Sequence, residues 1–116
     1  MLTKKTPETV KGIGTVKCAG DVSPLNLTFY NRTTDDLSSF MDTNITNAMP
    51  EGTKNPVAWV NAQVCLYIIK SFDDGTDTDF PLTLDGMLSM EAYYPNVLMG
   101  IIQLFHTARM AAVEKN

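Results

Sequence analysis

The chain has 116 residues, of which 44% are hydrophobic and 19% are charged. This length and composition predict a single folded domain that buries roughly two thirds of its unfolded surface, and they exclude disorder of the whole chain. The net charge is −4, and the nine Lys and Arg residues are scattered along the chain without forming a basic run. Nucleic-acid binding needs a basic stripe that neutralises phosphates, so we expect no nucleic-acid partner and no membrane partner.

The sequence carries no signal for export or membrane insertion. No apolar stretch follows the first lysines, as a secretory signal would need, and no apolar run approaches the ~20 residues that span a bilayer. We therefore expect a cytoplasmic protein. Cys18 and Cys65 lie far apart in apolar surroundings, which favours two reduced, packed thiols and leaves one structural disulfide as the alternative.

The first thirty residues predict an arm and a β-hairpin. Residues 1–11 have little apolar content and are expected to form a flexible N-terminal arm, with a single globular domain over residues 12–116. A short strand is expected over residues 13–19 and a turn over residues 21–24. Residues 25–30 then alternate apolar and polar, which is typical of a half-buried strand. Because a lone strand pair is marginal in water, its apolar face must pack on helices.

Two helices are expected in the middle of the chain. Thr33 and the acidic residues behind it suit a helix N-terminus, apolar residues continue at helical spacing to Met49, and Pro50 and Gly52 end the helix. A second helix is expected from Pro56 to at least Ile69. The run over residues 64–72 is also β-branched and aromatic enough to be a strand, and periodicity does not separate the two.

Two more helices are expected in the last third. Thr83 is predicted to cap a short helix over residues 84–92, in which Gly86 costs up to about 1 kcal/mol relative to alanine. A break follows at Tyr94, and Pro95 suits the first turn of a last helix that ends near Glu114. The predicted fold class is therefore α+β, with a short N-terminal antiparallel β-hairpin followed by a mainly α-helical bundle.

No catalytic or metal-binding constellation is evident. His106 is the only histidine, and neither cysteine lies at metal-ligand spacing from another ligand. The acidic segment over residues 73–79 has the carboxylates of a calcium loop, but Thr78 and Leu84 stand where that loop needs glycine and glutamate. We therefore expect a solvated, flexible loop over residues 71–81, and a protein that is not an enzyme and needs no cofactor or metal.

The chain has more apolar side chains than one core needs, which indicates a protein-binding surface. The chain has seven methionines, and methionine adapts well to irregular partners. Aromatic residues are enriched at the energetic centres of protein interfaces. A place in the core is the alternative for each of these residues; it is favoured for the methionines and Leu104 and is equally open for the aromatic residues. The candidate protein-binding residues are Trp59, Tyr67, Tyr93, Tyr94, Leu104 and Met110.

Four segments together resemble the tail assembly chaperones of lambda-like long-tailed bacteriophages. The hairpin segment reads GTVKCAGDVSPLNLTFYNR, a capped helix TTDDLSSFM follows it, and a central region around Trp59 comes next. The closing pattern LTLDGMLSMEAYYPNVLMGIIQLFHTARMAAVEKN combines a threonine-capped helix, a Tyr-Pro break and a long last helix. The resemblance covers roughly residues 12–116.

The resemblance implies a role in virus assembly. Such chaperones bind the tape measure protein and keep it soluble before the tail tube polymerises around it. The resemblance also implies a homo-oligomer, and a longer, frameshifted form that contacts the tail tube protein. Lys115-Asn116 is compatible with a slippery codon pair. Two alternatives stay open, namely a structural tail or head-completion subunit and a small cytosolic protein-binding regulator.

Overall fold

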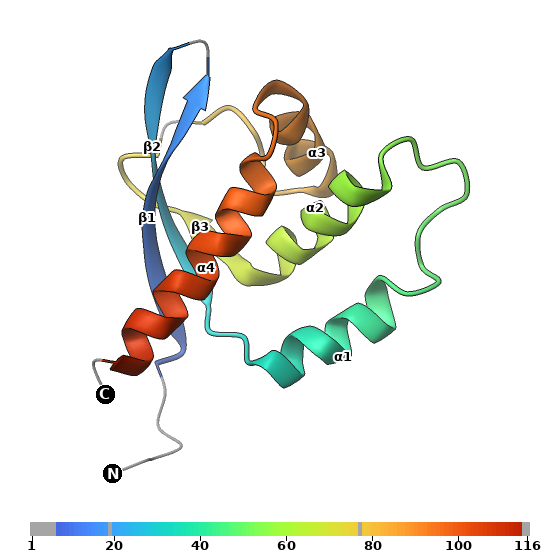
Figure 1. Cartoon of the computed structure of the whole chain (residues 1–116), viewed down its shortest axis with the longest axis horizontal. Coiled ribbons are helices and arrows are strands. Elements are labelled where there is room, and N and C mark those ends of the chain that lie inside the picture. Colours follow the sequence, from blue (N-terminus) through green and yellow to red (C-terminus); the bar gives the residue numbers. More distant parts are fainter. Residues whose placement is uncertain (1–6, 19, 77, 115–116) are drawn as a thin grey trace.

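The computed structural model describes residues 7–18, 20–76 and 78–114, and it has an α+β fold (Figure 1). Three strands form one antiparallel sheet in the order β1-β2-β3. The expected hairpin followed by a helical bundle is therefore only partly right, because a third strand lies between the second and third helices. In chain order the elements are β1 Thr9–Cys18, β2 Asp21–Tyr30, α1 Thr34–Asn44, α2 Pro56–Ile68, β3 Ile69–Phe72, α3 Leu84–Tyr93 and α4 Val97–Glu114.

The hairpin is longer than its sequence pattern indicates. β1 and β2 pair without interruption from Thr9↔Tyr30 to Cys18↔Asp21, so the predicted turn over residues 21–24 is wrong. The chain reverses between Cys18 and Asp21, where Gly20 has φ +87°, a value that suits glycine. The arm expected over residues 1–11 is also wrong at its end, since residues 9–11 belong to β1. Residues 1–6 of that arm lie outside the described residues.

Two glycines on β1 allow the last helix to lie close to the sheet. A Cβ atom on Gly12 would lie 2.7 Å from Phe29 Cε2 and 2.8 Å from Leu104 Cγ, and one on Gly14 would lie 3.3 Å from Leu104 Cδ2. A side chain at Gly12 would therefore require the side chains of Phe29 and Leu104 to move. Leu104, one of the candidate protein-binding residues, is half-buried against this part of β1.

The ambiguous run over residues 64–72 is both helix and strand. α2 continues to Ile68, and β3 begins at the next residue, so the helix expected to reach at least Ile69 ends one residue earlier. Ile68 and Ile69 are both buried. Ile69 pairs with Phe29 of β2, and the register shifts by an irregularity between Thr28 and Phe29. The helical layer and the sheet are thus joined without a loop.

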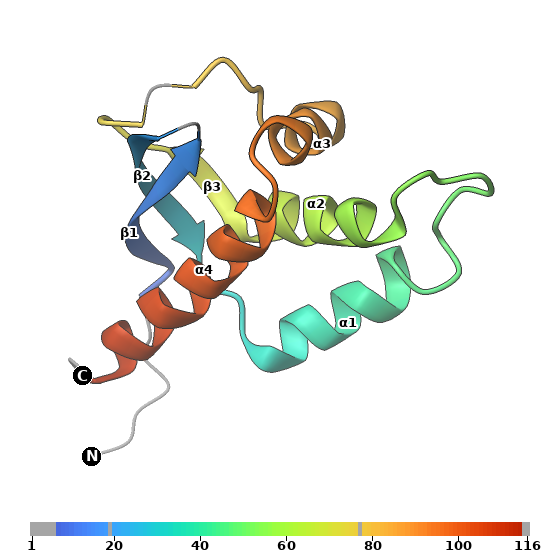
Figure 2. The ribbon, with the colours of Figure 1, turned by 45° about the horizontal axis from the view of Figure 1, so that its top comes forward.

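The core lies between the sheet and α2 and α4, which pack on the face that carries Leu27 and Phe29, and α3 packs on these two helices (Figures 1 and 2). The rings of Phe29 and Phe105 meet edge to face, with their centroids 5.5 Å apart. Cys65 is a free, buried cysteine, as predicted, and burial raises its thiol pKa to about 12. The side chain of Cys18 lies outside the described part of the chain.

Helix α1 lies to one side of this core. Its predicted cap is confirmed, because Thr33 Oγ1 accepts a hydrogen bond from Asp36 N (3.1 Å) and Asp36 Oδ2 accepts one from Thr33 N (2.8 Å). The helix ends at Asn44 and not near Met49, as the sequence indicated, and none of its eleven residues, all of them described, is buried.

An aromatic stack fixes α1 to the body of the protein. The ring of Phe40 on α1 is nearly parallel to that of Tyr67 on α2, and their centroids lie 4.2 Å apart. The Arg32 guanidinium lies 4.1 Å from the Tyr67 ring centroid and 4.5 Å from that of Tyr30. Arg32 Nε also donates to the Tyr67 carbonyl at 3.0 Å. Cations over aromatic faces are attracted by the ring quadrupole, so these contacts hold α1 in place.

The last two helices meet at a sharp junction. Thr83 caps α3 as predicted, accepting a hydrogen bond from Gly86 N at 3.0 Å. α4 starts at Val97, two residues later than expected, because Asn96 adopts φ 72° and interrupts the helix. The Glu91 carboxylate accepts hydrogen bonds from Asn96 N (2.6 Å) and Leu98 N (3.1 Å), and so it caps the start of α4.

Two helical glycines make a matched pair for a stability test. A Cβ atom on Gly86 would collide with the Pro81 carbonyl, whereas one on Gly100 of α4 would meet nothing within 4 Å. We predict that Gly86→Ala lowers the free energy of unfolding by about 1–3 kcal/mol through overpacking. Gly100→Ala should raise it by up to about 1 kcal/mol, the helix-propensity gain of alanine over glycine. Chemical denaturation of both variants checks this, and an equal gain for both would contradict the packing of α3 against Pro81.

Candidate functional site

A groove of about 470 Å³ opens between the hairpin, the segment after β3, and α3 together with the start of α4. We call it the hairpin–α3 groove. Its lining is mainly apolar, with a few hydroxyl groups and one carboxylate. The lining residues are Val16, Ser23, Pro24, Leu25, Thr76, Thr78, Asp79, Phe80, Met90, Tyr93, Tyr94 and Val97.

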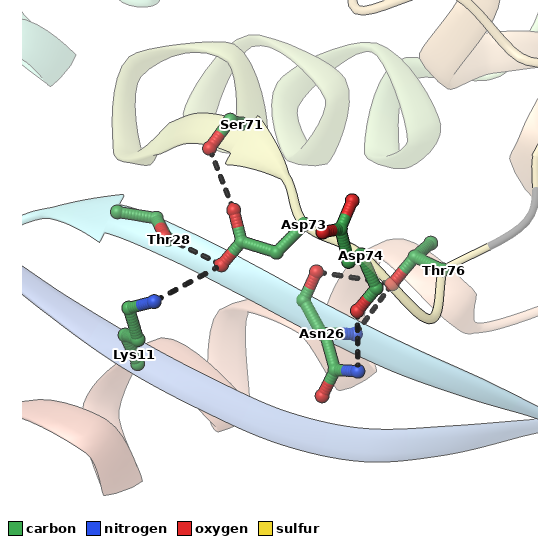
Figure 3. Close-up of polar contacts among 7 residues, drawn as sticks. All are labelled: Lys11, Asn26, Thr28, Ser71, Asp73, Asp74 and Thr76. Carbon is green, nitrogen blue, oxygen red and sulfur yellow. Dashed lines mark hydrogen bonds and ion pairs between the residues drawn. The ribbon is translucent and has the colours of Figure 1, made fainter.

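The segment after β3 is fixed to β2 through the backbone of Asn26 (Figure 3). Asn26 N donates to Thr76 Oγ1 at 2.5 Å, and the Thr76 hydroxyl donates to the Asn26 carbonyl at 3.0 Å. Asp73 N donates to the same carbonyl at 2.8 Å, and Asn26 Nδ2 donates to the Asp74 carbonyl at 2.9 Å. The predicted loop over residues 71–81 is therefore wrong at Ser71 and Phe72, which belong to β3, and right for residues 73–76, which form a turn that hydrogen bonds anchor to β2.

A tight turn closes this anchored segment. Thr76 N donates to the Asp73 carbonyl at 3.0 Å across a four-residue turn, and Gly75 adopts φ +95° within it. A Cβ atom on Gly75 would lie 2.5 Å from Asn26 Nδ2. Backbone conformation and space both require glycine here. Thr76 at the end of this turn lines the groove, as does Thr78. Asp77 lies outside the described residues.

Asp73 joins the segment to the outer face of the sheet (Figure 3). The Thr28 hydroxyl donates to Asp73 Oδ2 at 2.6 Å, and the Ser71 hydroxyl donates to Asp73 Oδ1 at 2.9 Å. Lys11 Nζ lies 4.0 Å from Oδ2. The Thr28 hydrogen bond is the largest cause that lowers the Asp73 pKa below its ordinary value of 3.8, and the Ser71 hydrogen bond and the Lys11 charge lower it further. The Asp73 carboxylate is therefore engaged in contacts that hold this segment on the sheet.

Three aromatic rings form the side of the groove opposite the hairpin. The Phe80 ring centroid lies 5.9 Å from that of Tyr93 and 6.2 Å from that of Tyr94, and the second pair meets edge to face. Tyr94 is half-buried, whereas Tyr93 is 70% exposed. Aromatic clusters of this kind offer rigid apolar area at low entropic cost. The exposed Tyr93 places such area at the surface.

The structure brings together two of the six candidate binding residues, Tyr93 and Tyr94. Met110 is 65% exposed on α4, outside the groove lining. Trp59 is only 7% exposed and is buried near the start of α2. Tyr67 is engaged in the stack with Phe40 and Arg32, and Leu104 packs on β1.

Sequence reasoning missed the other apolar residues of the groove. Phe80 lies in a segment predicted to be a solvated, flexible loop, and Pro24 lies in a predicted turn. The one available signal was the apolar pair at Phe80 and Pro81, which is unusual at the end of an acidic loop. From the sequence alone, Val16 and Met90 are equally compatible with a place in the core. They line a shared groove because the hairpin lies near α3, a long-range arrangement that no local pattern predicts.

The groove presents mainly apolar side chains, with hydroxyl groups and the Asp79 carboxylate beside them. Within residues 7–18, 20–76 and 78–114, no three His, Cys, Asp or Glu side chains gather to hold a metal ion. His106 is exposed on α4, beside the Phe105 ring at a centroid distance of 5.3 Å. In the described part of the chain, no helix has the length and apolar character needed to cross a bilayer.

Comparisons with known proteins give no match to this chain among family models, curated proteins or solved structures.

The hydrogen bonds of Asp73 predict an acid-sensitive contribution to stability. Because its pKa is lowered in the folded state, this contribution is present above the unfolded value of 3.8 and is lost as the pH falls below it. We expect Asp73→Asn to flatten the decline of the unfolding free energy between about pH 5 and pH 3. Chemical denaturation across that range measures the slope. Asp74→Asn is the control, since Asp74 bonds Asn26 through its backbone carbonyl, and equal slopes for both variants would contradict the assignment.

Proposed function

We propose that this chain is a non-enzymatic tail assembly chaperone of a long-tailed bacteriophage, which binds the tape measure protein and keeps it soluble before the tail tube polymerises. The observation that carries the proposal is the hairpin–α3 groove, which is open, mainly apolar and edged by an exposed tyrosine. The resemblance of the sequence to tail assembly chaperones supports the same role and names the client.

The dimensions of the groove suit side chains of a helical client. Its volume of about 470 Å³ accommodates a few large apolar side chains and not a whole helix. An amphipathic helix presents such side chains at a spacing of three and four residues along one face. Phe80, Tyr93 and Tyr94 would contact them, while Ser23, Thr78 and Asp79 at the groove offer hydrogen bonds to polar client groups.

Binding of this kind is suited to a chaperone. A long tape measure protein exposes repeated apolar stripes until the tail tube surrounds it, and covering those stripes prevents aggregation. Many weak contacts along one chain gain strength when the bound copies also contact each other. In this proposal the protein acts in the cytoplasm of the bacterial host as a homo-oligomer, and a longer form contacts the tail tube protein.

Co-expression with the tape measure protein of a long-tailed bacteriophage tests the proposal. We expect this chain to keep the client in the soluble fraction and to form a complex with it. Tyr93→Ala should weaken the complex at least about tenfold, because an exposed aromatic anchor contributes at least about 1.4 kcal/mol at an interface. Titration by calorimetry or fluorescence anisotropy measures the change.

Met110→Ala is the matched control, since Met110 is similarly exposed but lies outside the groove lining. It should leave the affinity unchanged, and both variants should retain the unfolding midpoint of the parent protein. A client that precipitates equally with and without this chain would rule out the chaperone role. Recovery of the chain in purified virions would favour a structural subunit, and an unaffected client with a different specific partner would favour a regulator.

A further inference from the structure

Strand β1 is an edge of the sheet, because the order β1-β2-β3 leaves one of its sides unpaired within the described residues. Asn31 N donates to the Glu8 carbonyl at 2.9 Å, just beyond the paired segment. In an antiparallel pair, the residues that bond to the partner strand alternate with those that point away. The even-numbered residues of β1 therefore bond to β2, and residues 9, 11, 13, 15 and 17 direct their N–H and C=O groups outwards.

The same odd-numbered residues carry side chains on the uncovered face of the sheet. Lys11, Thr15 and Lys17 are exposed, and Ile13 between them is 77% exposed. A long, regular edge strand with an exposed isoleucine is a template for pairing with another strand. Charged residues on an edge strand usually oppose such pairing, so the positions of Lys11 and Lys17 decide which registers are allowed.

We propose that β1 pairs with β1 of a second copy of this chain, antiparallel about a two-fold axis at Ile13. In this register Ile13 lies opposite its own copy, Lys11 lies opposite Thr15, and Lys17 lies opposite Thr9. On the inner face, Val10 lies opposite Val16 and Gly12 opposite Gly14. No two lysines face each other, and the exposed isoleucines cover one another across the axis.

In the neighbouring registers, either lysines face each other across the strand pair or the contact between the two isoleucines is lost. If the axis lies at Gly14, Lys11 faces Lys17 twice in the dimer, and like charges directly opposite each other destabilise a strand pair. If the axis lies at Gly12, each lysine at position 11 faces an isoleucine, and the contact between the two isoleucines is lost. Only the axis at Ile13 satisfies both constraints, so the sequence of β1 specifies one register.

Helix α4, which packs on β1, also leaves room for the α4 of a second copy. Leu104 is the α4 residue that packs on Gly12 and Gly14, so its flank of α4 lies nearest β1. Gly100, Thr107 and Ala111 share this flank at helical spacing, and all three are small and exposed. Two packed helices lie 8–10 Å apart, and small side chains allow the closer distances. A second α4 can therefore approach along this flank when the strands pair.

Two substitutions of opposite charge at Thr15 test the proposal on the full chain. Thr15 is exposed on the uncovered face, so its replacement does not disturb the core. Thr15→Lys places a lysine opposite Lys11 twice per dimer and should weaken dimerisation by about tenfold, whereas Thr15→Glu should strengthen it. Sedimentation equilibrium from low micromolar to millimolar protein measures both constants against the parent chain.

Cross-linking identifies the register. Ile13→Cys should form a disulfide-linked dimer under mild oxidation, because the two copies of residue 13 lie directly opposite each other. Thr15→Cys should not, since its copies are offset by four residues along the paired strands. A parent chain that stays monomeric at millimolar concentration, or a dimer that both substitutions at Thr15 leave unchanged, would overturn the proposal. This inference is independent of client binding, so a dimer through β1 stands even if the tape measure protein proves not to be a partner.

Discussion

The close contact between β1 and α4 is the constraint on which the rest of the structure depends. A Cβ atom on Gly12 would lie within 3 Å of both Phe29 and Leu104, so the strand and the helix touch with no side chain from β1 between them. This approach lets Phe105 reach Phe29 on the neighbouring strand. With α4 fixed on the sheet, α3 and the aromatic pair at its end are held beside the hairpin, where they form the groove.

Local signals predicted most of the helices, because helix capping is decided within four residues. Thr33 and Thr83 cap their helices as expected, and Pro56 occupies the first turn of α2. The alternation at Leu25, Leu27 and Phe29 likewise identified a strand with one buried face. In each case the residues that specify the structure are close in sequence.

Long-range contacts account for the features that the sequence did not predict. The ten-residue length of β1 depends on its pairing with β2, and its glycines would otherwise disfavour a strand. The transition from α2 to β3 is set by the pairing of Ile69 with Phe29, since the residues on either side suit both structures. The groove combines residues from four separate segments, and only Tyr93 and Tyr94 stood out in the sequence as surface candidates.

The direct passage from α2 into β3 also limits how the chain can change in length. A residue inserted in α2 would rotate the end of the helix by about 100° and move every side chain of β3 to the other face of the sheet. Ile68 and Ile69, both buried, would then lose their places together. The connection over residues 45–55 between α1 and α2 carries no such coupling. Insertions and deletions among relatives of this protein should therefore gather there and be absent from residues 56–72.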